Sequence, residues 1–319
     1  MNFLKAHKTL TKAKNVLVSA HVHPDPDAIS SELAIAAYLR RLGKNVTIVH
    51  EAKLPERFLF LPGAKTIRRA KDVKRKAFDT FVLVDCGDID RIGTVARFIR
   101  PGDAVINIDH HVTNSYFGTV NLVDVKASST AEVIYRFFKK VKFPIEKITA
   151  QLLYVGMMTD TGSFRYDNTS AFTHGAVSEL MKFPIAVSDL YTKLYESLPL
   201  IDLKYFSKVV NTFQTLWNGQ VAVLELHKID VAKFSQDFDL RDKLFRYLRA
   251  IKDIEVVVIF TELNRKQTRV NLRSQGKVDV AKIAAYFNGG GHQRASGCLV
   301  EGDIKQAKKQ VLARIRKAL

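Results

Sequence analysis

The sequence predicts an α/β protein: a mostly parallel sheet flanked by helices in the N-terminal part, joined by a helical connector to a smaller α/β domain. Short strand-like runs alternate with helical periods through the first half. These runs are apolar throughout, as in parallel strands that are covered on both faces. The alternation then stops before a second group of strands begins. The 319 residues suit two domains of roughly 100–200 residues each.

In the first half, four apolar runs are predicted as strands. They cover residues 15–20, 46–49, 80–84 and 104–108. A helix over residues 29–42 follows the first run and ends at Gly43, a common helix terminator. Further helical patterns cover residues 129–140, 149–158 and 170–181.

The stretch from Val187 to Leu216 is helical in character apart from Pro199, and it carries no strand pattern. We therefore place the first domain at residues 1–188, the helical connector at 189–209 and the second domain at 210–319. The second domain is predicted to contain strands at residues 220–226, 254–262 and 268–274, with helices at 278–287 and from residue 304 onward.

Composition narrows the function classes. The formal net charge is +18, from 50 Lys and Arg against 32 Asp and Glu. This excess suits a polyanionic partner or a plain solvated surface, and charge alone does not decide between them. Two cysteines exclude a disulfide-stapled secreted scaffold. No apolar run approaches the roughly 18 residues of a membrane span, so we expect a soluble, cytoplasmic protein without a membrane partner.

Acidic and histidine side chains gather where predicted strands or helices end. They are His21, Asp25 and Asp27; Asp85; Asp109, His110 and His111; and Asp160. Loops at the carboxyl ends of parallel strands converge on one crevice, so we expect these clusters to meet. Four of these carboxylates would lie close together and repel one another unless cations are bound. They are those of Asp25, Asp27, Asp85 and Asp160. Mixed carboxylate and imidazole ligands suit Mn²⁺, and a pair of such ions stabilises the attacking and leaving oxygens in phosphoryl chemistry.

Each cluster alone also has a structural explanation. Asp25 and Asp27 lie beside prolines, where Asp forms turns. Asp85 could cap a helix, residues 109–111 could form an exposed loop, and His21 could be a hydrogen-bonded structural histidine. The occurrence of all four clusters at element ends in one α/β block favours the metal site.

The motifs resemble those of the DHH phosphoesterase family. The resemblance rests on His21-x-x-Pro-Asp25-x-Asp27, Val84-Asp85, Asp109-His110-His111 and Thr159-Asp160-Thr-Gly-Ser-Phe164, in this order. Downstream, Asn288-Gly289-Gly290-Gly291-His292 matches the glycine-rich signature of the associated DHHA1 domain. The chain's size and short connector are most similar to the nanoRNase (oligoribonuclease) and 3′-phosphoadenosine-5′-phosphate phosphatase branch, rather than to the longer RecJ-type exonucleases.

The resemblance implies two divalent cations, with Mn²⁺ expected and Mg²⁺ or Co²⁺ as alternatives. His21, Asp25 and Asp85 would hold one ion. Asp27, Asp85, His110 and Asp160 would hold the other, with Asp85 as the bridge. Asp109 would orient a ligating imidazole by accepting its second N–H. His111 would face the scissile phosphate and either bond to it or assist the leaving group.

The resemblance also implies a substrate grip in the second domain. Arg273 would hold a phosphate, and the glycine segment would form a cradle that closes over the catalytic crevice. The small residues at 295–297 are expected to form the following turn. Ser129 either offers its hydroxyl near the phosphate or simply caps a helix. The substrate-binding candidates are Ser129, Arg273, Gly289, Gly290, Gly291, His292 and Ser296.

The function implied is hydrolysis of short oligoribonucleotides to mononucleotides, and of 3′-phosphoadenosine 5′-phosphate to AMP. Partners would be short RNA or DNA oligonucleotides or small nucleotides, and a homodimer is left open. One alternative is a phosphodiesterase acting on linear or cyclic dinucleotides such as pApA, pGpG and c-di-AMP. Another is a non-catalytic nucleic-acid-binding relative that has kept the fold.

Overall fold

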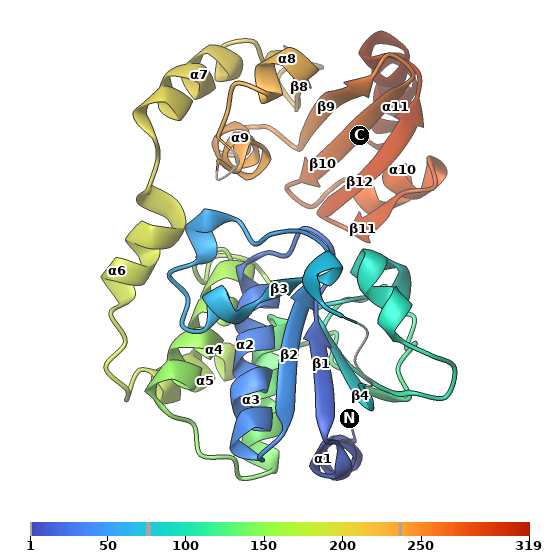
Figure 1. The fold of residues 1–319 in the computed structure, drawn as a ribbon. Coiled ribbons are helices and arrows are strands. Elements are labelled where there is room, and N and C mark those ends of the chain that lie inside the picture. The colour runs from blue at the N-terminus through green and yellow to red at the C-terminus, as the bar shows by residue number, and fades with distance from the viewer. Residues whose placement is uncertain (1, 75–77, 236–237) are drawn as a thin grey trace. The chain divides into compact units, whose positions relative to one another are not determined.

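The computed structural model describes residues 2–74, 78–235 and 238–319. The chain divides into two compact units, residues 1–196 and 197–319. Each unit has a six-stranded sheet and a hydrophobic core of its own (Figure 1). Among the described residues, no helix combines the length and the apolar character needed to cross a membrane.

The sheet of the first unit is parallel throughout, as predicted. Its strand order is β3-β2-β1-β4-β5-β6. The strands are β1 (Asn15–Ser19), β2 (Asn45–His50), β3 (Arg68–Arg69), β4 (Thr80–Val84), β5 (Ala104–Asp109) and β6 (Val120–Val123). The four predicted strands lie in the centre of this order, and the unpredicted β3 and β6 form its edges.

Both faces of this sheet are covered, which explains why its central strands are apolar at successive positions. Val16, Val82 and Ile106 pack into the core formed with the helices of one face. Leu17 and Phe81 pack on the opposite face, against the 3₁₀ segment η4 (Ile89–Phe98).

The helices of the unit are α1 (Phe3–Lys12), α2 (Pro26–Arg41), α3 (Thr130–Lys140), α4 (Lys147–Asp160), α5 (Ala171–Leu180) and α6 (Val187–Tyr191). It also contains the short 3₁₀ turns η1 (Glu56–Phe58), η2 (Ala64–Thr66) and η3 (Ala70–Asp72) and the π-helix η5 (Thr192–Glu196).

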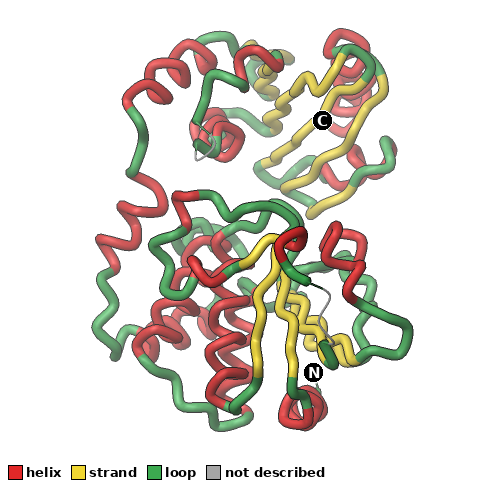
Figure 2. The backbone as a smooth tube through the Cα atoms, in the orientation of Figure 1, coloured by secondary structure: helices red, strands yellow, loops and turns green. Residues whose placement is uncertain are grey.

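The second unit contains a mixed sheet in the order β11-β12-β10-β9-β8-β7, in which β8 and β9 are parallel and the other neighbours antiparallel. Figure 2 shows its strands in yellow and its helices in red. The strands are β7 (Gln214–Leu216), β8 (Val221–Leu226), β9 (Val256–Asn264), β10 (Gln267–Ser274), β11 (Gly290–His292) and β12 (Ala295–Glu301). The helices are α7 (Leu200–Val210), α8 (Lys228–Val231), α9 (Leu240–Leu248), α10 (Val280–Tyr286) and α11 (Ile304–Ala318). Residues of α10 and α11 share one core with the sheet, and residues of α7 and α9 share another.

Two local predictions are wrong. The stretch 187–216 was expected to lack strands, but Gln214–Leu216 forms β7 by antiparallel pairing with β8. The small residues 295–297 were expected to form a turn, but they lie in β12, where Ala295 is opposite Arg273 of β10. In both cases pairing with a neighbouring strand sets the conformation, and that pairing leaves no periodic signal in a short segment.

Candidate metal centre

The acidic and histidine residues meet where the strand order of the first sheet reverses. β1 and β4 are neighbours, and the chain runs outward from them in opposite directions to β2 and β5. Ligands of open α/β sheets bind at such a reversal, beside the carboxyl ends of the strands. His21 follows β1, Asp85 follows β4 and His110 follows β5. The strand topology therefore brings these side chains together from distant parts of the sequence.

Three overlapping groups of described side chains could each hold a metal ion, and Asp85 belongs to two of them. Within each group, the potential ligand atoms lie within 4.8 Å of one another. Asp85 Oδ2 is 3.4 Å from His21 Nε2, and Asp85 Oδ1 is 3.7 Å from His110 Nε2. The two oxygens of one carboxylate thus face imidazoles of different groups. The groups are His21, Asp25 and Asp85; Asp27, His110 and Asp160; and a third, overlapping group of Asp85, His110 and His111.

The imidazoles of His21 and His110 are oriented as metal ligands usually are. His21 Nδ1 lies 2.8 Å from the carbonyl oxygen of Val22, and His110 Nδ1 lies 3.4 Å from that of Ala127. An Nδ1–H that donates to a carbonyl fixes the tautomer and leaves Nε2 as the ligand atom. In both residues Nε2 is the atom that faces the carboxylates. The donor set therefore fits divalent cations.

The N-terminus of α3 stabilises the carboxylates. The backbone N–H groups of Thr130 and Ala131 donate to Asp27 at 2.8 and 3.0 Å, and the Thr130 hydroxyl donates to Asp85 Oδ1 at 2.8 Å. A helix N-terminus favours negative charge. Ser129 was predicted either to offer its hydroxyl near the phosphate or to cap a helix. It is fully buried and caps α3 by accepting the Glu132 N–H. The next residue, Thr130, contacts the cluster, a role that the sequence analysis missed.

Asp25 and Asp85 combine structural and potential ligand roles. Asp25 is the N-cap of α2, where its Oδ1 accepts the Ala28 N–H at 3.0 Å. Asp25 therefore caps a helix and also belongs to a group that could hold a metal ion. Asp85 has a left-handed backbone with φ of 53°, a conformation that Asp and Asn adopt more readily than most residues. Its N–H donates to the carbonyl of Ile108 at 2.9 Å, which anchors the strained residue to β5.

Charge and burial shift the proton affinities of the cluster in opposite directions. Burial, together with the charges of neighbouring aspartates, raises the pKa of Asp27 and of Asp160 well above the usual range. Burial also opposes ionisation of Asp85, but the hydrogen bond from His21 and the surrounding histidines hold the pKa of Asp85 below its usual range. Burial disfavours the charge of His21, yet its contacts with Asp85 raise its pKa to about 9. The metal-free cluster therefore holds protons that a cation would displace.

We expect the metal-free protein to lose stability as the pH rises from about 6 to about 9. A group whose pKa is raised by folding stabilises the fold at any pH below its pKa in the unfolded chain. This stabilisation is lost as the pH rises through the pKa of the group in the folded protein. His21 titrates up to about 9, and Asp27 and Asp160 act in the same direction. A bound divalent ion should oppose the trend, because deprotonated ligands bind it more tightly. Thermal unfolding with EDTA and with Mn²⁺ measures both effects, and a midpoint that rises with pH in EDTA would contradict the prediction.

Comparison with known proteins agrees with this geometry. The family model for the DHH family, N-terminal domain, matches residues 15–157, and that for the DHHA1 domain matches residues 218–319. The bifunctional oligoribonuclease and PAP phosphatase NrnA of Thermus thermophilus is 30% identical over 95% of this chain and 90% of its own. The chain belongs to the DHH/DHHA1 phosphoesterase family.

Two further relatives cover most of the chain. The protein of the same name from Bacillus subtilis is 28% identical over 92% of this chain and 91% of its own. The crystal structure of an exopolyphosphatase-related protein from Bacteroides fragilis is 26% identical, with a TM-score of 0.89 over 99% of this chain and 96% of that one. The similarity therefore extends through both units and is not restricted to the acidic motifs.

In the DHH region, His111 is linked to a buried carboxylate. Its Nδ1 is 2.7 Å from Asp109 Oδ1, and Asn114 Nδ2 donates to Asp109 Oδ2 at 2.6 Å. Burial disfavours the charged imidazole, but the bond to Asp109 and the charge of Asp85 raise the pKa of His111. Asp109 was expected to orient a ligating imidazole. The structure instead pairs it with His111, while His110 uses the Ala127 carbonyl.

Gly156 of α4 is a second residue whose role the sequence analysis missed. An added Cβ would lie 2.4 Å from Asp27 Oδ1 and 2.5 Å from the Cβ of Ala131. Side chains do not tolerate such distances, so the absence of a Cβ lets α4 pack closely against Asp27 and α3. The available signal is a glycine inside a predicted helix, which often marks a close approach.

The glycine segment of the DHHA1 region forms one strand of a β-hairpin. Gly290–His292 pair with Ala295–Gly297 as β11 and β12. A Cβ on Gly289 would lie 2.3 Å from the carbonyl oxygen of Gly297, so no side chain fits there. Gly291 has φ of 138°, which L side chains rarely adopt. Ser296 is buried, and its hydroxyl donates to the Val280 carbonyl at 2.6 Å. That hydroxyl therefore serves the fold of the hairpin.

Arg273 lies on β10, next to α9. Its guanidinium carbon is 4.8 Å from the centre of the Phe245 ring, and its Nη1 donates to the Leu272 carbonyl at 3.0 Å. This stacking holds the planar group on the surface of the sheet. The predicted metal ligands belong to the first unit, whereas Arg273 and the glycine segment belong to the second.

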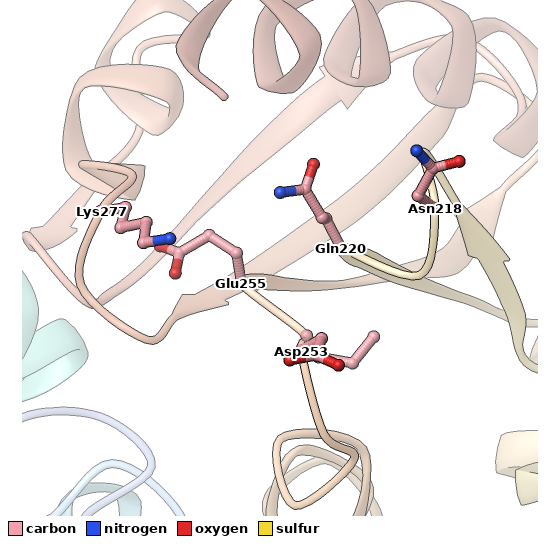
Figure 3. A pocket seen from close by; sticks show the side chains of 6 residues that line it. Asn218, Gln220, Asp253, Glu255 and Lys277 are labelled. Carbon is pink, nitrogen blue, oxygen red and sulfur yellow. The ribbon is translucent and has the colours of Figure 1, made fainter.

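A separate pocket of about 470 Å³ lies in the DHHA1 region (Figure 3). Its one deeply buried carboxylate, Glu255, accepts the N–H groups of Gly276 at 3.3 Å and Val278 at 2.9 Å. None of the predicted site residues lines this pocket. Glu255 thus holds a turn in place, and the metal centre remains the chemically distinctive site.

Proposed function

We propose that this chain is a manganese-dependent, two-metal phosphoesterase. Its substrates would be short oligoribonucleotides, hydrolysed to mononucleotides, and 3′-phosphoadenosine 5′-phosphate, hydrolysed to AMP. The observation that carries the proposal is that the two carboxylate oxygens of Asp85 face His21 and His110, which belong to different groups of potential ligands. Support for the substrate class comes from the Thermus thermophilus and Bacillus subtilis relatives, which are named as bifunctional oligoribonucleases and PAP phosphatases. The two free, buried cysteines suit a cytoplasmic location.

Each ion would take ligands from one group, with Asp85 shared. His21, Asp25 and Asp85 would hold the first. Asp27, Asp85, His110 and Asp160 would hold the second. Carboxylate oxygens with imidazole nitrogens suit Mn²⁺ better than Ca²⁺, which prefers oxygen alone. When bound, such a pair would activate water and neutralise charge that develops on the phosphoryl oxygens.

The chain's own residues would orient the substrate and handle protons. In the His111–Asp109 pair, Nδ1 is engaged by the carboxylate, and Nε2 would present a proton to the leaving oxygen. Asp109 is a positioning residue, and its second bond from Asn114 fixes its plane. The raised pKa of His111 keeps that proton available near neutral pH. In the second unit, Arg273 would bind a phosphate of the substrate.

Replacing His111 with Gln should lower kcat about 10²-fold for a dinucleotide. The reason is that a ribose oxygen is a poor leaving group that needs a proton. Hydrolysis of bis-p-nitrophenyl phosphate should fall much less, because nitrophenolate leaves without one. Equal losses on both substrates would contradict the proton-donor role and indicate that His111 only binds the phosphate.

Assays in Mn²⁺ with di- to pentaribonucleotides and with 3′-phosphoadenosine 5′-phosphate test the proposed function. We expect mononucleotides from the former and AMP from the latter. Parallel reactions with pApA, pGpG and cyclic dinucleotides compare the alternative substrates. Failure to release product from any oligoribonucleotide or from the bisphosphate would contradict the proposal, and a strong preference for cyclic dinucleotides would replace it with the alternative.

A further inference from the structure

The second unit has a sheet face that changes from apolar to basic at β10. Side chains alternate along this strand, and its buried face comprises Val270 and Leu272, which pack with residues of α10 and α11. Arg269, Asn271 and Arg273 lie on the other face, since alternate residues of a strand share a face. These three are partly exposed. One strand therefore presents two arginines and an amide in a row.

The same face is apolar on the neighbouring strand β9. Arg273 is opposite Val257, and Asn271 is opposite Ile259. Val257 and Ile259 belong to the core that includes residues of α7 and α9. Directly opposite residues share a face, so this core stops at β10 and the basic row begins at its edge. At the far end of the row, Gln267 is opposite Glu301 of β12.

Helix α9 adds positive charge beside this row. Phe245 of α9 stacks with Arg273 of this row, and Arg241 lies one turn earlier on the same face of the helix. Burial lowers the pKa of Arg241, the charge of Arg269 lowers it further, and the charge of Asp239 opposes these shifts. Two arginines held near each other repel, and a bound anion relieves the repulsion. Other charged residues of α9 and its ends are the cations Lys243, Arg246 and Arg249 and the carboxylates Asp239 and Asp242. Positive charge prevails on this segment.

An apolar residue completes the pattern. Leu299 of β12 is 47% exposed and is directly opposite Arg269. Between Arg269 and Arg273, a Cβ on Gly297 would lie 3.0 Å from Asn271 Nδ2, so the amide lies across a position without a side chain. The Asn271 Oδ1 is buried and has no hydrogen-bond partner within the described residues. Proteins bind nucleic acids with cations and amides at the phosphates and sugars and with apolar contacts to the bases.

We propose that Arg269 and Arg241, with Leu299, form a second nucleotide subsite that binds phosphates beyond the one at Arg273. Arg269 and Arg273 are four residues apart on an antiparallel strand, about 14 Å at roughly 3.4 Å per residue. Because the Arg273 guanidinium is held against the Phe245 ring, a chain of several nucleotides can place different phosphates at the two arginines. The subsite rests on the proposed function and adds a length preference to it: longer oligoribonucleotides gain contacts that a dinucleotide cannot make.

Equilibrium binding of labelled oligoribonucleotides tests the subsite apart from hydrolysis. Full-length protein is titrated in Ca²⁺ with an RNA dinucleotide and an RNA pentanucleotide at several salt concentrations, and RNA integrity is verified afterwards. The variants are Arg269→Ala, Arg241→Ala, their combination and Arg269→Lys. Lys305→Ala is the matched control, an exposed cation on α11, which packs on the other face of the sheet. Thermal unfolding verifies that each variant folds.

We expect each alanine variant to lower the ratio of pentanucleotide to dinucleotide affinity about tenfold. The slope of log K against log salt for the pentanucleotide should become shallower by about 0.7 for each arginine removed. Arg269→Lys should keep the slope, and Lys305→Ala should change neither quantity. Arg241→Ala on the helix remains informative if the β10 variants fail to fold.

An unchanged ratio in the folded variants would overturn the subsite, and so would equal losses on the two RNA lengths. Length-dependent, arginine-dependent binding without any hydrolysis in Mn²⁺ would reject the proposed function and leave the RNA subsite standing. The two proposals can therefore fail separately.

Discussion

Asp85→Asn should reduce hydrolysis of every substrate on the order of 10³-fold. The substitution removes the charge of the one carboxylate whose two oxygens face His21 and His110 at 3.4 and 3.7 Å. Asn tolerates the left-handed backbone at this position, so the fold should survive. Steady-state rates in Mn²⁺ and a calorimetric count of bound Mn²⁺ measure the effect, and we expect fewer bound ions as well as lost turnover.

Asp88→Asn is the matched control. Asp88 lies three residues away and caps η4 by accepting the Asp90 N–H, a role that Asn also fills. Its substitution should leave turnover within about twofold of the parent protein. If the Asp85→Asn protein instead kept its turnover, the shared-carboxylate assignment would be wrong.

Gly156→Ala should lower turnover about 10- to 100-fold, the range typical of residues that support metal ligands. The new methyl group would lie 2.4 Å from Asp27 Oδ1, so the carboxylate must move away from its bonds with the α3 amides. In an ordinary helix the same change is stabilising by about 1 kcal/mol. Weaker Mn²⁺ binding in calorimetry should accompany the loss of turnover.

Gly175→Ala in α5 separates this contact from helix propensity. An added Cβ there meets nothing within 4 Å, so stability should rise slightly and turnover should not change. A Gly156→Ala protein that binds Mn²⁺ and turns over substrate like its parent would show that the close approach to Asp27 is unimportant.

Sequence patterns predict the centre of the first sheet well, because its strands are buried on both faces. The run Thr80–Val84 is fully buried and needs no knowledge of its neighbours to be recognised. The short strands β7 and β11 exist through pairing with β8 and β12, and no local periodicity reports such pairing. Helix α9 was also missed, although it carries Phe245, which stacks with Arg273.

Some residues of the candidate site could likewise be predicted from the sequence and others could not. Its aspartates and histidines could be predicted because they directly follow strands of one parallel sheet, whose topology makes them converge. The contributions of Thr130 and Gly156 could not be predicted. They depend on how α3 and α4 pack against Asp27 of α2, which is a property of the assembled unit. The pairing of Asp109 with His111 likewise depends on backbone geometry after β5.

The proposed mechanism depends most on two cations sharing Asp85. The direct measurement is an anomalous difference map, recorded at the manganese absorption edge from crystals grown with Mn²⁺. We predict two peaks, one beside His21 and Asp25 and one beside Asp27, His110 and Asp160, with Asp85 contacting both. A single peak, or two peaks of which only one contacts Asp85, would contradict the two-metal centre.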